Sequence, residues 1–237
     1  MAVISQDKYI VRERIAEAPG VFTLKMSRPD NTIPQYFSGQ FINIYFPELK
    51  TPEGKAYSIS SYPKEKTLNI TVKGMGEFSN RLSALNPGDT VSASSPCGYF
   101  FSESLDSPLI LIGAGIGLAP FRSIIFDAID KNPKREIFLF SSNRTQNDII
   151  FWETLNETFP KHKKFNQKHF ITREEKIPKG MVEGRIKTDV ILESVKNISE
   201  PEFLICGSIS FVRDIWRALK ESGISEESMY TEAFFSH

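Results

Sequence analysis

One segment constrains the fold more than any other: residues 108–120, "PLILIGAGIGLAP", an apolar run that continues into alternating glycines and a proline. A run that is apolar at successive positions is typical of a parallel strand buried on both faces. From Phe121 onward, apolar side chains recur at helical spacing, and Pro120 suits the first turn of a helix. Strand, glycine turn and helix in this order predict one unit of an α/β domain.

The rest of the C-terminal part repeats this pattern. Three further segments have the character of buried strands, "EIFLFSS", "KHFIT" and "EFLICGS", and helical stretches lie between and after them. One of these helices is predicted at 211–222, where Gly223 ends it. Alternating strands and helices predict a doubly wound parallel sheet.

The first hundred residues have a different pattern, short strands interrupted by turns. The segment "LNITVK" alternates, with Leu68, Ile70 and Val72 on one face and polar residues on the other. Other strand-like segments are "FTLKM", "QFINIYF" and "TVSAS", and "NPGD" at 86–89 is a strong turn. These features predict a compact antiparallel β-barrel. We place the boundary within 100–108 and expect an α+β chain of two domains, 1–104 (barrel) and 105–237 (α/β).

Composition excludes several classes of function. The 237 residues contain 29 Lys and Arg and 29 Asp and Glu, so no overall charge attracts nucleic acid or an anionic membrane. The N-terminus has no signal-peptide pattern, and the longest apolar run, near 109–121, is too short to span a bilayer.

Cysteine and histidine usage narrows the chemistry further. The two cysteines, Cys97 and Cys206, form no CxxC pair, which excludes iron–sulfur or zinc ligation by the usual spacings. So few cysteines suit a reducing compartment, and we expect a cytoplasmic location. The histidines, His162, His169 and His237, are isolated in sequence, so we expect surface side chains and no metal site.

Three segments have backbone suited to binding a ligand, each with a structural alternative. The glycine loop before Pro120 can present N–H groups and a helix N-terminus to a pyrophosphate, and its flanking strand and helix favour that interpretation over a simple bend. A short helix marked by Phe78, Leu82 and Leu85 follows Gly76; Ser79 there could bind an anion or only cap the helix. Cys206 and Gly207 end a predicted strand, where a ligand contact and an inert buried thiol are equally compatible with the sequence.

A fourth segment, 54–63 or "GKAYSISSYP", is less regular. By itself it could be an edge strand that enters a Ser/Pro loop. Its Ser60 and Ser61 are expected only to turn the chain.

Together and in this order, these elements resemble the ferredoxin–NADP reductase superfamily of FAD-dependent electron-transfer enzymes. The resemblance covers essentially the whole chain and rests on six motifs. The Arg-x-Tyr-Ser/Thr motif corresponds to 55–58, Gly-x-x-Ser to 76–79, Gly-Pro-x-Gly-x-Phe to 95–100, Gly-x-Gly-x-x-Pro to 115–120, Cys-Gly to 206–207 and Glu-x-Phe to 232–234.

The resemblance implies roles for residues of the first half. Tyr57 would stack on the flavin ring, and the Ser58 hydroxyl would hydrogen-bond flavin N5. Lys55 would supply charge to an FAD phosphate, and Lys73 with the 76–79 turn would hold the pyrophosphate. The other residues expected to contact FAD are Ala56, Val72, Gly76, Phe78 and Ser79.

The second half would bind the nicotinamide cofactor. Gly113, Gly115, Gly117 and Pro120 would approach the pyrophosphate of NAD or NADP. Cys206, followed by Gly207, would lie near the reacting nicotinamide carbon. The remaining residues implied by the resemblance are Glu232 beside the nicotinamide, and Phe234 and Phe235 covering the flavin. We therefore expect three catalytic residues: Ser58, Cys206 and Glu232.

The choice between the two nicotinamide cofactors stays open. Ser142 and Arg144 lie just past the second strand of the sheet and could bind a 2′-phosphate. Arg144 could equally pair with Asp148 at a helix start.

The implied function is transfer of a hydride from NAD(P)H to FAD, followed by electron delivery to a separate protein such as ferredoxin, flavodoxin or an oxygenase component. The alternatives are a non-catalytic FAD-binding subunit of a larger redox complex and a nucleotide-binding protein without flavin. Two positions depart from the family pattern. Lys55 replaces an Arg and loses its rigid two-pronged phosphate contact, and Ser95 replaces a Gly. The oligomeric state is left open.

Overall fold

A computed structural model describes residues 6–158 and 161–234 of the chain. These residues form two compact units. Of the described residues, the first unit contains 6–99 and 119–127, and the second contains 100–118, 128–158 and 161–234. The division between residues 104 and 105 stays a prediction.

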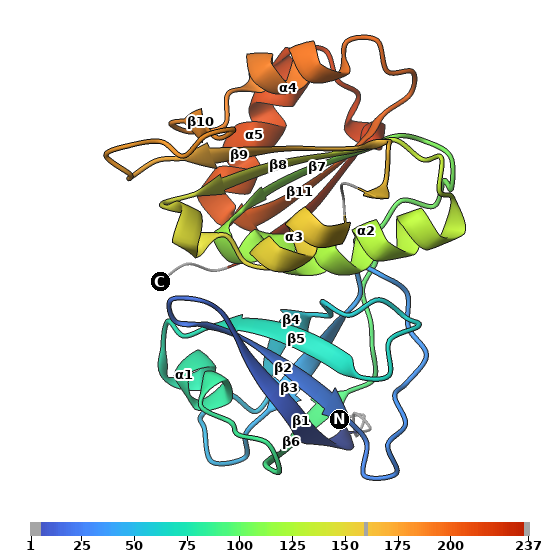
Figure 1. Cartoon of the computed structure of the whole chain (residues 1–237). Helices are drawn as coiled ribbons and strands as arrows, with labels where there is room; N and C mark the ends of the chain where they lie inside the picture. Colours follow the sequence, from blue (N-terminus) through green and yellow to red (C-terminus); the bar gives the residue numbers. More distant parts are fainter. Residues whose placement is uncertain (1–5, 159–160, 235–237) are drawn as a thin grey trace. The chain divides into compact units, whose positions relative to one another are not determined.

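The first unit is built on a six-stranded antiparallel sheet with the strand order β4-β3-β6-β1-β2-β5 (Figure 1). Past β4, Ile59 bridges to Ile70, and the Ser60 amide donates to the Asn69 carbonyl at 2.8 Å. These contacts join the two edges of the sheet. The elements are β1 (Gln6–Ala18), β2 (Val21–Ser27), β3 (Phe41–Tyr45), β4 (Lys55–Ser58), β5 (Leu68–Lys73), α1 (Glu77–Ser83) and β6 (Thr90–Ser94). The predicted antiparallel N-terminal architecture is confirmed.

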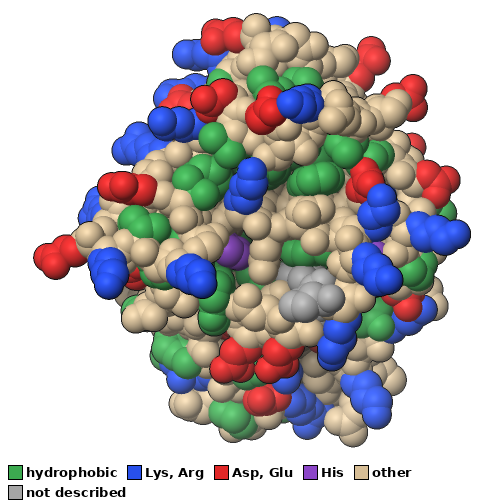
Figure 2. Space-filling model, turned by 45° about the horizontal axis from the view of Figure 1, so that its top comes forward, with side chains coloured by type: hydrophobic (Ala, Val, Ile, Leu, Met, Phe, Trp, Pro, Cys, Tyr) green, Lys and Arg blue, Asp and Glu red, His purple; other side chains and the backbone are tan. Residues whose placement is uncertain are grey.

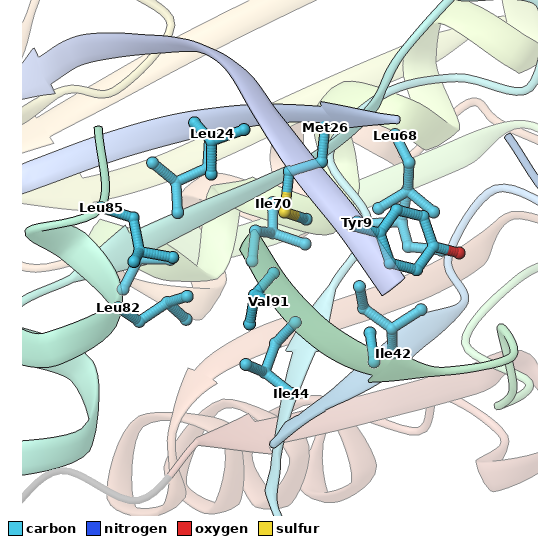
Figure 3. Close-up of a cluster of buried hydrophobic side chains, with 14 of the residues drawn as sticks. Tyr9, Leu24, Met26, Ile42, Ile44, Leu68, Ile70, Leu82, Leu85 and Val91 are labelled. Atoms are coloured by element: carbon cyan, nitrogen blue, oxygen red, sulfur yellow. The ribbon is translucent and has the colours of Figure 1, made fainter. Parts of the chain in front are cut away.

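The core of this unit lies between its strands and helix α1. Figure 3 shows side chains from several strands meeting those of Leu82 and Leu85. Phe78, Leu82 and Leu85 are all buried, as their spacing predicts. Burial of large apolar side chains, about 1.5–3 kcal/mol each, therefore holds α1 against the sheet.

The polar face of β5 is not exposed to solvent, contrary to what its alternation suggests. Asn69 and Thr71 are 2% and 4% exposed. The Thr71 hydroxyl contacts the hydroxyls of Thr23 at 2.9 Å and Ser60 at 3.0 Å. Partners far apart in sequence therefore satisfy these polar groups, which lets a strand with alternating residues be buried on both faces.

Ser60 and Ser61 do more than turn the chain, so that expectation was wrong. Both are fully buried. The Ser61 hydroxyl oxygen accepts from the Asn69 amide at 2.9 Å, and the Ser61 carbonyl accepts from the Ser123 hydroxyl at 2.6 Å. Arg122, on the same helix α2 (Ala119–Lys131), donates to the Ser60 carbonyl at 2.8 Å and contacts Glu65 at 2.6 Å. This polar network fastens the loop after β4.

The second unit contains a six-stranded parallel sheet with the order β10-β9-β8-β7-β11-β12 (Figure 1). Its strands are β7 (Leu109–Ala114), β8 (Ile137–Asn143), β9 (Phe165–Ile171), β10 (Val182–Glu183), β11 (Glu202–Ser208) and β12 (Met229–Phe234). The α-helices of this unit are α3 (Trp152–Thr158), α4 (Thr188–Val195) and α5 (Ile209–Glu221). Its short 3-10 helices include η1 (Gly115–Leu118), η2 (Gln146–Asp148) and η4 (Glu226–Ser228). The predicted parallel sheet is confirmed.

Helices α4 and α5 cover one face of this sheet with apolar side chains. Ile191 of α4 and Leu219 of α5 join the same buried cluster as Phe140 and Phe170 of the strands. The other face carries α3, whose Trp152 ring packs edge-on against His169 at 5.4 Å between ring centroids. A sheet covered on both faces explains why its central strands are apolar throughout.

A buried ion pair joins segments at the amino ends of the strands. Arg135 is 6% exposed, and its guanidinium lies 3.6 Å from the Glu202 carboxylate. The Ser102 hydroxyl bonds both side chains, and Arg135 also donates to the Ser107 carbonyl at 2.8 Å. The segment that precedes β7 is thus tied to the base of β11.

The expectation of surface histidines was wrong for the two that the structure describes. His169 and His162 are 4% and 9% exposed, and His237 lies outside the described residues. The Ser141 hydroxyl lies 2.6 Å from His169 Nδ1, and Asn143 donates to that hydroxyl at 3.2 Å. The partner of His169 is 28 residues away, so the burial has no local sequence signal.

Basic and acidic side chains are interspersed on the face shown in Figure 2. Within 6–158 and 161–234, no helix is long and apolar enough to cross a membrane. The same residues contain no group of three or more His, Cys, Asp or Glu that could hold a metal ion.

Buried His169 should make stability depend on pH. Burial lowers its pKa from 6.5 to about 4, so between these values the unfolded chain binds a proton that the folded chain does not. This contribution to stability is complete above pH 6.5 and is lost as the pH falls to 4, by about 3 kcal/mol. Urea unfolding of wild type and His169→Gln across this range should show a shallower loss in the variant; parallel curves would contradict it.

Candidate functional site

Strand β4 carries the four residues of the "KAYS" motif at an edge of the first sheet. It pairs with β3, so that Ser58 lies opposite Phe41 and Tyr57 opposite Ile42. Lys55 and Tyr57 alternate with Ala56 and Ser58 and therefore share one face of the strand. Lys55 and Ala56 are exposed, Tyr57 is half-buried and Ser58 is buried.

The shared face of Lys55 and Tyr57 meets Phe78 of α1. The Tyr57 and Phe78 rings are stacked with 6.3 Å between centroids and 20° between planes, and Lys55 Nζ lies 5.6 Å from the Phe78 centroid. Burial raises the pKa of the Tyr57 phenol above its usual value, so the ring is neutral at physiological pH. The site therefore combines a neutral aromatic ring with an exposed cation.

The turn after β5 holds the other predicted residues of this half. The Ser79 hydroxyl oxygen accepts from the amides of Met75 at 2.9 Å and Gly76 at 3.0 Å, which fastens the start of the seven-residue helix α1. Val72 is fully buried in the core, and Lys73 at the end of β5 is half-buried; contact of either residue with FAD stays a prediction. The capping role of Ser79 is thus observed, and its contact with an anion stays a prediction.

The second unit brings its predicted residues together at the carboxyl edge of the parallel sheet. Strand register places Cys206 opposite Gly113 on one side and opposite Glu232 on the other. Ser141 lies opposite Gly113 on the next strand, and Ser142 opposite Ala114. Ligands of open α/β sheets bind at this edge, so the register supports a common site for these residues.

The two glycines Gly115 and Gly117 of this edge have different surroundings. A Cβ on Gly117 would lie 2.3 Å from the Cys206 carbonyl oxygen, so η1 can approach β11 only without a side chain there. Gly115 has φ +51°, and a Cβ on it would meet nothing within 4 Å. Gly117 is thus required for packing, whereas Gly115 leaves its backbone open to a ligand. Pro120 occupies the first turn of α2, as predicted.

Cys206 is a neutral thiol in this setting. It is fully buried, and its pKa is raised well above the usual value by burial and by Glu232. Of the two interpretations that the sequence left open, burial agrees with the inert thiol, and the neutral form is a poor nucleophile. A contact between Cys206 and a ligand stays a prediction.

The edge next to β8 has basic side chains. Asp148 accepts from the Thr145 amide at 2.9 Å and hydroxyl at 2.8 Å, which is a helix cap rather than an ion pair with Arg144. Arg144 is exposed, and its carbonyl accepts from the Arg173 amide at 2.8 Å. The sequence analysis missed Arg173; its place directly after a buried strand was the available signal.

The last predicted residues lie at the end of β12. Glu232 and Phe234 are half-buried, and Phe234 pairs with Ser208 in the sheet. Phe235 lies outside the described residues. Their contacts with cofactors stay predictions.

Comparison with known proteins identifies both halves. Residues 8–101 match the oxidoreductase FAD-binding domain, and residues 111–217 match the oxidoreductase NAD-binding domain. The F subunit of the Na⁺-translocating NADH-quinone reductase of Neisseria meningitidis is 28% identical over 209 residues, 80% of this chain and 51% of that protein. The flavohemoprotein of Bacillus subtilis is 27% identical over 95% of this chain and 58% of its own length. The chain thus spans about half the length of these relatives.

Solved structures agree on the fold. The cytochrome P450 reductase of Amycolatopsis has a TM-score of 0.83 at 23% identity and covers 98% of this chain and 71% of its own. A ferredoxin NADP⁺ reductase from Neisseria gonorrhoeae, solved with FAD and NADP, has a TM-score of 0.82 at 22% identity over 97% and 99% of the two chains. Fold and domains define an oxidoreductase that binds FAD and a nicotinamide cofactor. The chain thus carries an oxidoreductase FAD-binding domain followed by an oxidoreductase NAD-binding domain, with the fold of ferredoxin–NADP reductase structures.

The residues of each unit suit these cofactors. In the first unit, an exposed ammonium beside a half-buried neutral ring matches a phosphate and an isoalloxazine. In the second, the open backbone at Gly115 leaves room for a pyrophosphate.

The contact between Gly117 and Cys206 can be tested directly. Gly117→Ala should lower the free energy of unfolding by about 2 kcal/mol, because backbone must move to admit the methyl group. Gly115→Ala, which only strains φ, should cost about 1 kcal/mol. Urea denaturation of the cofactor-free variants measures both. A Gly117→Ala protein as stable as wild type would show that the edge is less tightly packed than described.

Proposed function

We propose that this chain takes a hydride from NAD(P)H and passes the electrons to a separate redox protein such as ferredoxin, flavodoxin or an oxygenase component. Bound FAD supplies the redox chemistry by accepting the hydride at N5 and then releasing electrons. The observation that carries the proposal is the register of the parallel sheet, which aligns Gly113, Cys206 and Glu232 in a chain that also has the "KAYS" strand.

The first unit is proposed to hold and orient the flavin. Tyr57 offers a neutral ring for stacking, Lys55 neutralises phosphate charge, and Lys73 with the 76–79 turn binds the pyrophosphate. The Ser58 hydroxyl, buried in β4, is proposed to donate a hydrogen bond to N5. A donor fixed at that atom orients the flavin ring and polarises N5 toward an incoming hydride.

The second unit is proposed to hold the nicotinamide cofactor at its carboxyl edge. Backbone of the Gly115 turn would bind the pyrophosphate, and the Cys206 thiol would contact the nicotinamide without adding charge, because it stays protonated. Arg144 and Arg173 favour a 2′-phosphate, so we propose that NADPH is preferred over NADH. Glu232 is proposed to lie beside the nicotinamide, and Phe234 is proposed to cover the flavin.

The acceptor is proposed to be a redox group that these 237 residues do not themselves carry. The 237 residues contain two cysteines and no CxxC pair, so no ligand set for an iron–sulfur cluster lies in this sequence. The relatives named above include a component of a quinone reductase and a P450 reductase. The choice among protein acceptors and the cytoplasmic location stay predictions.

Anaerobic titration of the purified protein with NADPH and NADH tests the function. The flavin absorbance near 450 nm should bleach with one equivalent of NADPH per FAD, and at higher concentrations with NADH. A yellow protein that neither nucleotide bleaches would instead support a non-catalytic FAD-binding subunit. A colourless protein that FAD fails to reconstitute would support a nucleotide-binding protein without flavin.

Replacement of Ser58 tests the donor to N5. Ser58→Ala should slow flavin reduction by NADPH on the order of 10²-fold while changing FAD affinity little. Stopped-flow absorbance measures the rate. Ser60→Ala is the matched control, since that buried hydroxyl contacts Thr71 and should affect stability rather than rate. An unchanged rate in Ser58→Ala would remove Ser58 from the mechanism.

A further inference from the structure

We infer that Phe78 is the positioning residue that compensates for a lysine at position 55, because its ring holds the Lys55 ammonium and the Tyr57 ring in the geometry that FAD binding requires. The inference rests on the proposed function, in which Lys55 neutralises a phosphate of FAD and Tyr57 stacks on the flavin. Phe78 is then not a direct contact of the cofactor, as the sequence analysis expected, but acts through Lys55 and Tyr57.

Burial decides that Phe78 acts indirectly. The side chain is 3% exposed and belongs to the core of the first unit. Its ring packs edge-on against Phe46, with 5.0 Å between centroids and 60° between planes. A ring held in this way has little freedom to turn toward a ligand, so its contribution passes through the groups that lie on it.

Two of those groups come from β4. Lys55 Nζ lies 5.6 Å from the Phe78 centroid, within the range of a cation–π interaction, and the Tyr57 ring stacks at 6.3 Å and 20°. Within the described residues, no carboxylate lies at ion-pair distance from Lys55. The aromatic ring is therefore the group in this part of the chain that restrains the ammonium.

This restraint compensates for the flexibility of the lysine side chain. An arginine would present a planar fork that is already organised for a phosphate, whereas a lysine carries a compact charge on a flexible stem of four carbons. A ring beneath the ammonium limits the positions of that stem before a ligand arrives. Because the same ring also stacks on Tyr57, one buried side chain fixes the spacing between the cation and the aromatic surface.

A double-mutant cycle on FAD affinity tests the inference without measuring turnover. FAD is removed, and the dissociation constant of added FAD is measured by quenching of its fluorescence for wild type, Phe78→Leu, Lys55→Ala and the double variant. Phe78→Leu should weaken FAD binding about tenfold when Lys55 is present. With Lys55→Ala it should weaken binding only about threefold, the part that acts through Tyr57.

Leu68→Ala is the matched control. Leu68 is a fully buried member of the same core, and Figure 3 shows it away from Leu82 and Leu85, so its loss perturbs that core without removing the Phe46 contact that holds the Phe78 ring. FAD affinity in this variant should stay within about twofold of wild type. If Phe78→Leu does not fold, Phe78→Met replaces it in the same cycle, since methionine keeps an apolar side chain of similar volume.

Two results would overturn the inference alone. One is an equal effect of Phe78→Leu in the wild-type and Lys55→Ala backgrounds, and the other is an equal loss of affinity in Leu68→Ala. In both cases wild type still binds FAD, so the proposed function stands. Failure of the wild-type protein to bind FAD would overturn the inference and the proposed function together. The cycle therefore separates the two.

Discussion

The close approach of backbone at Gly117 to the carbonyl of Cys206 is the constraint on which the second unit depends. It draws the turn after β7 onto the end of β11, and a side chain at Gly117 would force the two apart. The parallel register of the neighbouring strands then places Glu232, Cys206 and Gly113 side by side across the sheet. Gly117, which has the sequence pattern of a phosphate-binding loop, is thus required first for packing, whereas Gly115 beside it has open space.

In the first unit, side-chain contacts hold the candidate site strand β4 in place. Strand β4 lies at a sheet edge, where backbone pairing alone gives it one partner strand. Its position is reinforced by the Phe78 ring on one side and by the buried network of Ser60, Ser61 and Arg122 just beyond it. Apolar and polar contacts thus fix the two ends of a four-residue strand, which would otherwise be weakly held.

Sequence predicted the features that local pattern encodes and missed those that depend on distant partners. The apolar runs before Gly113 and Cys206 have the spacing of buried strands, and the stripe of Phe78 predicts α1. Burial of His169 could not be predicted, because its partner Ser141 becomes adjacent only through pairing of β8 with β9. Strand β12 was missed because exposed residues alternate along this edge strand, which hides it among loops.

The charge state of the carboxyl edge limits which chemistry the protein itself can perform there. Cys206 keeps its proton because burial and Glu232 both oppose the thiolate, and the lowered pKa of His169 keeps that imidazole neutral in the same row of the sheet. Neither group is then a strong nucleophile or an acid at neutral pH. Side chains of this kind shape and orient a bound molecule, so the redox step must come from the cofactors that the two domains bind.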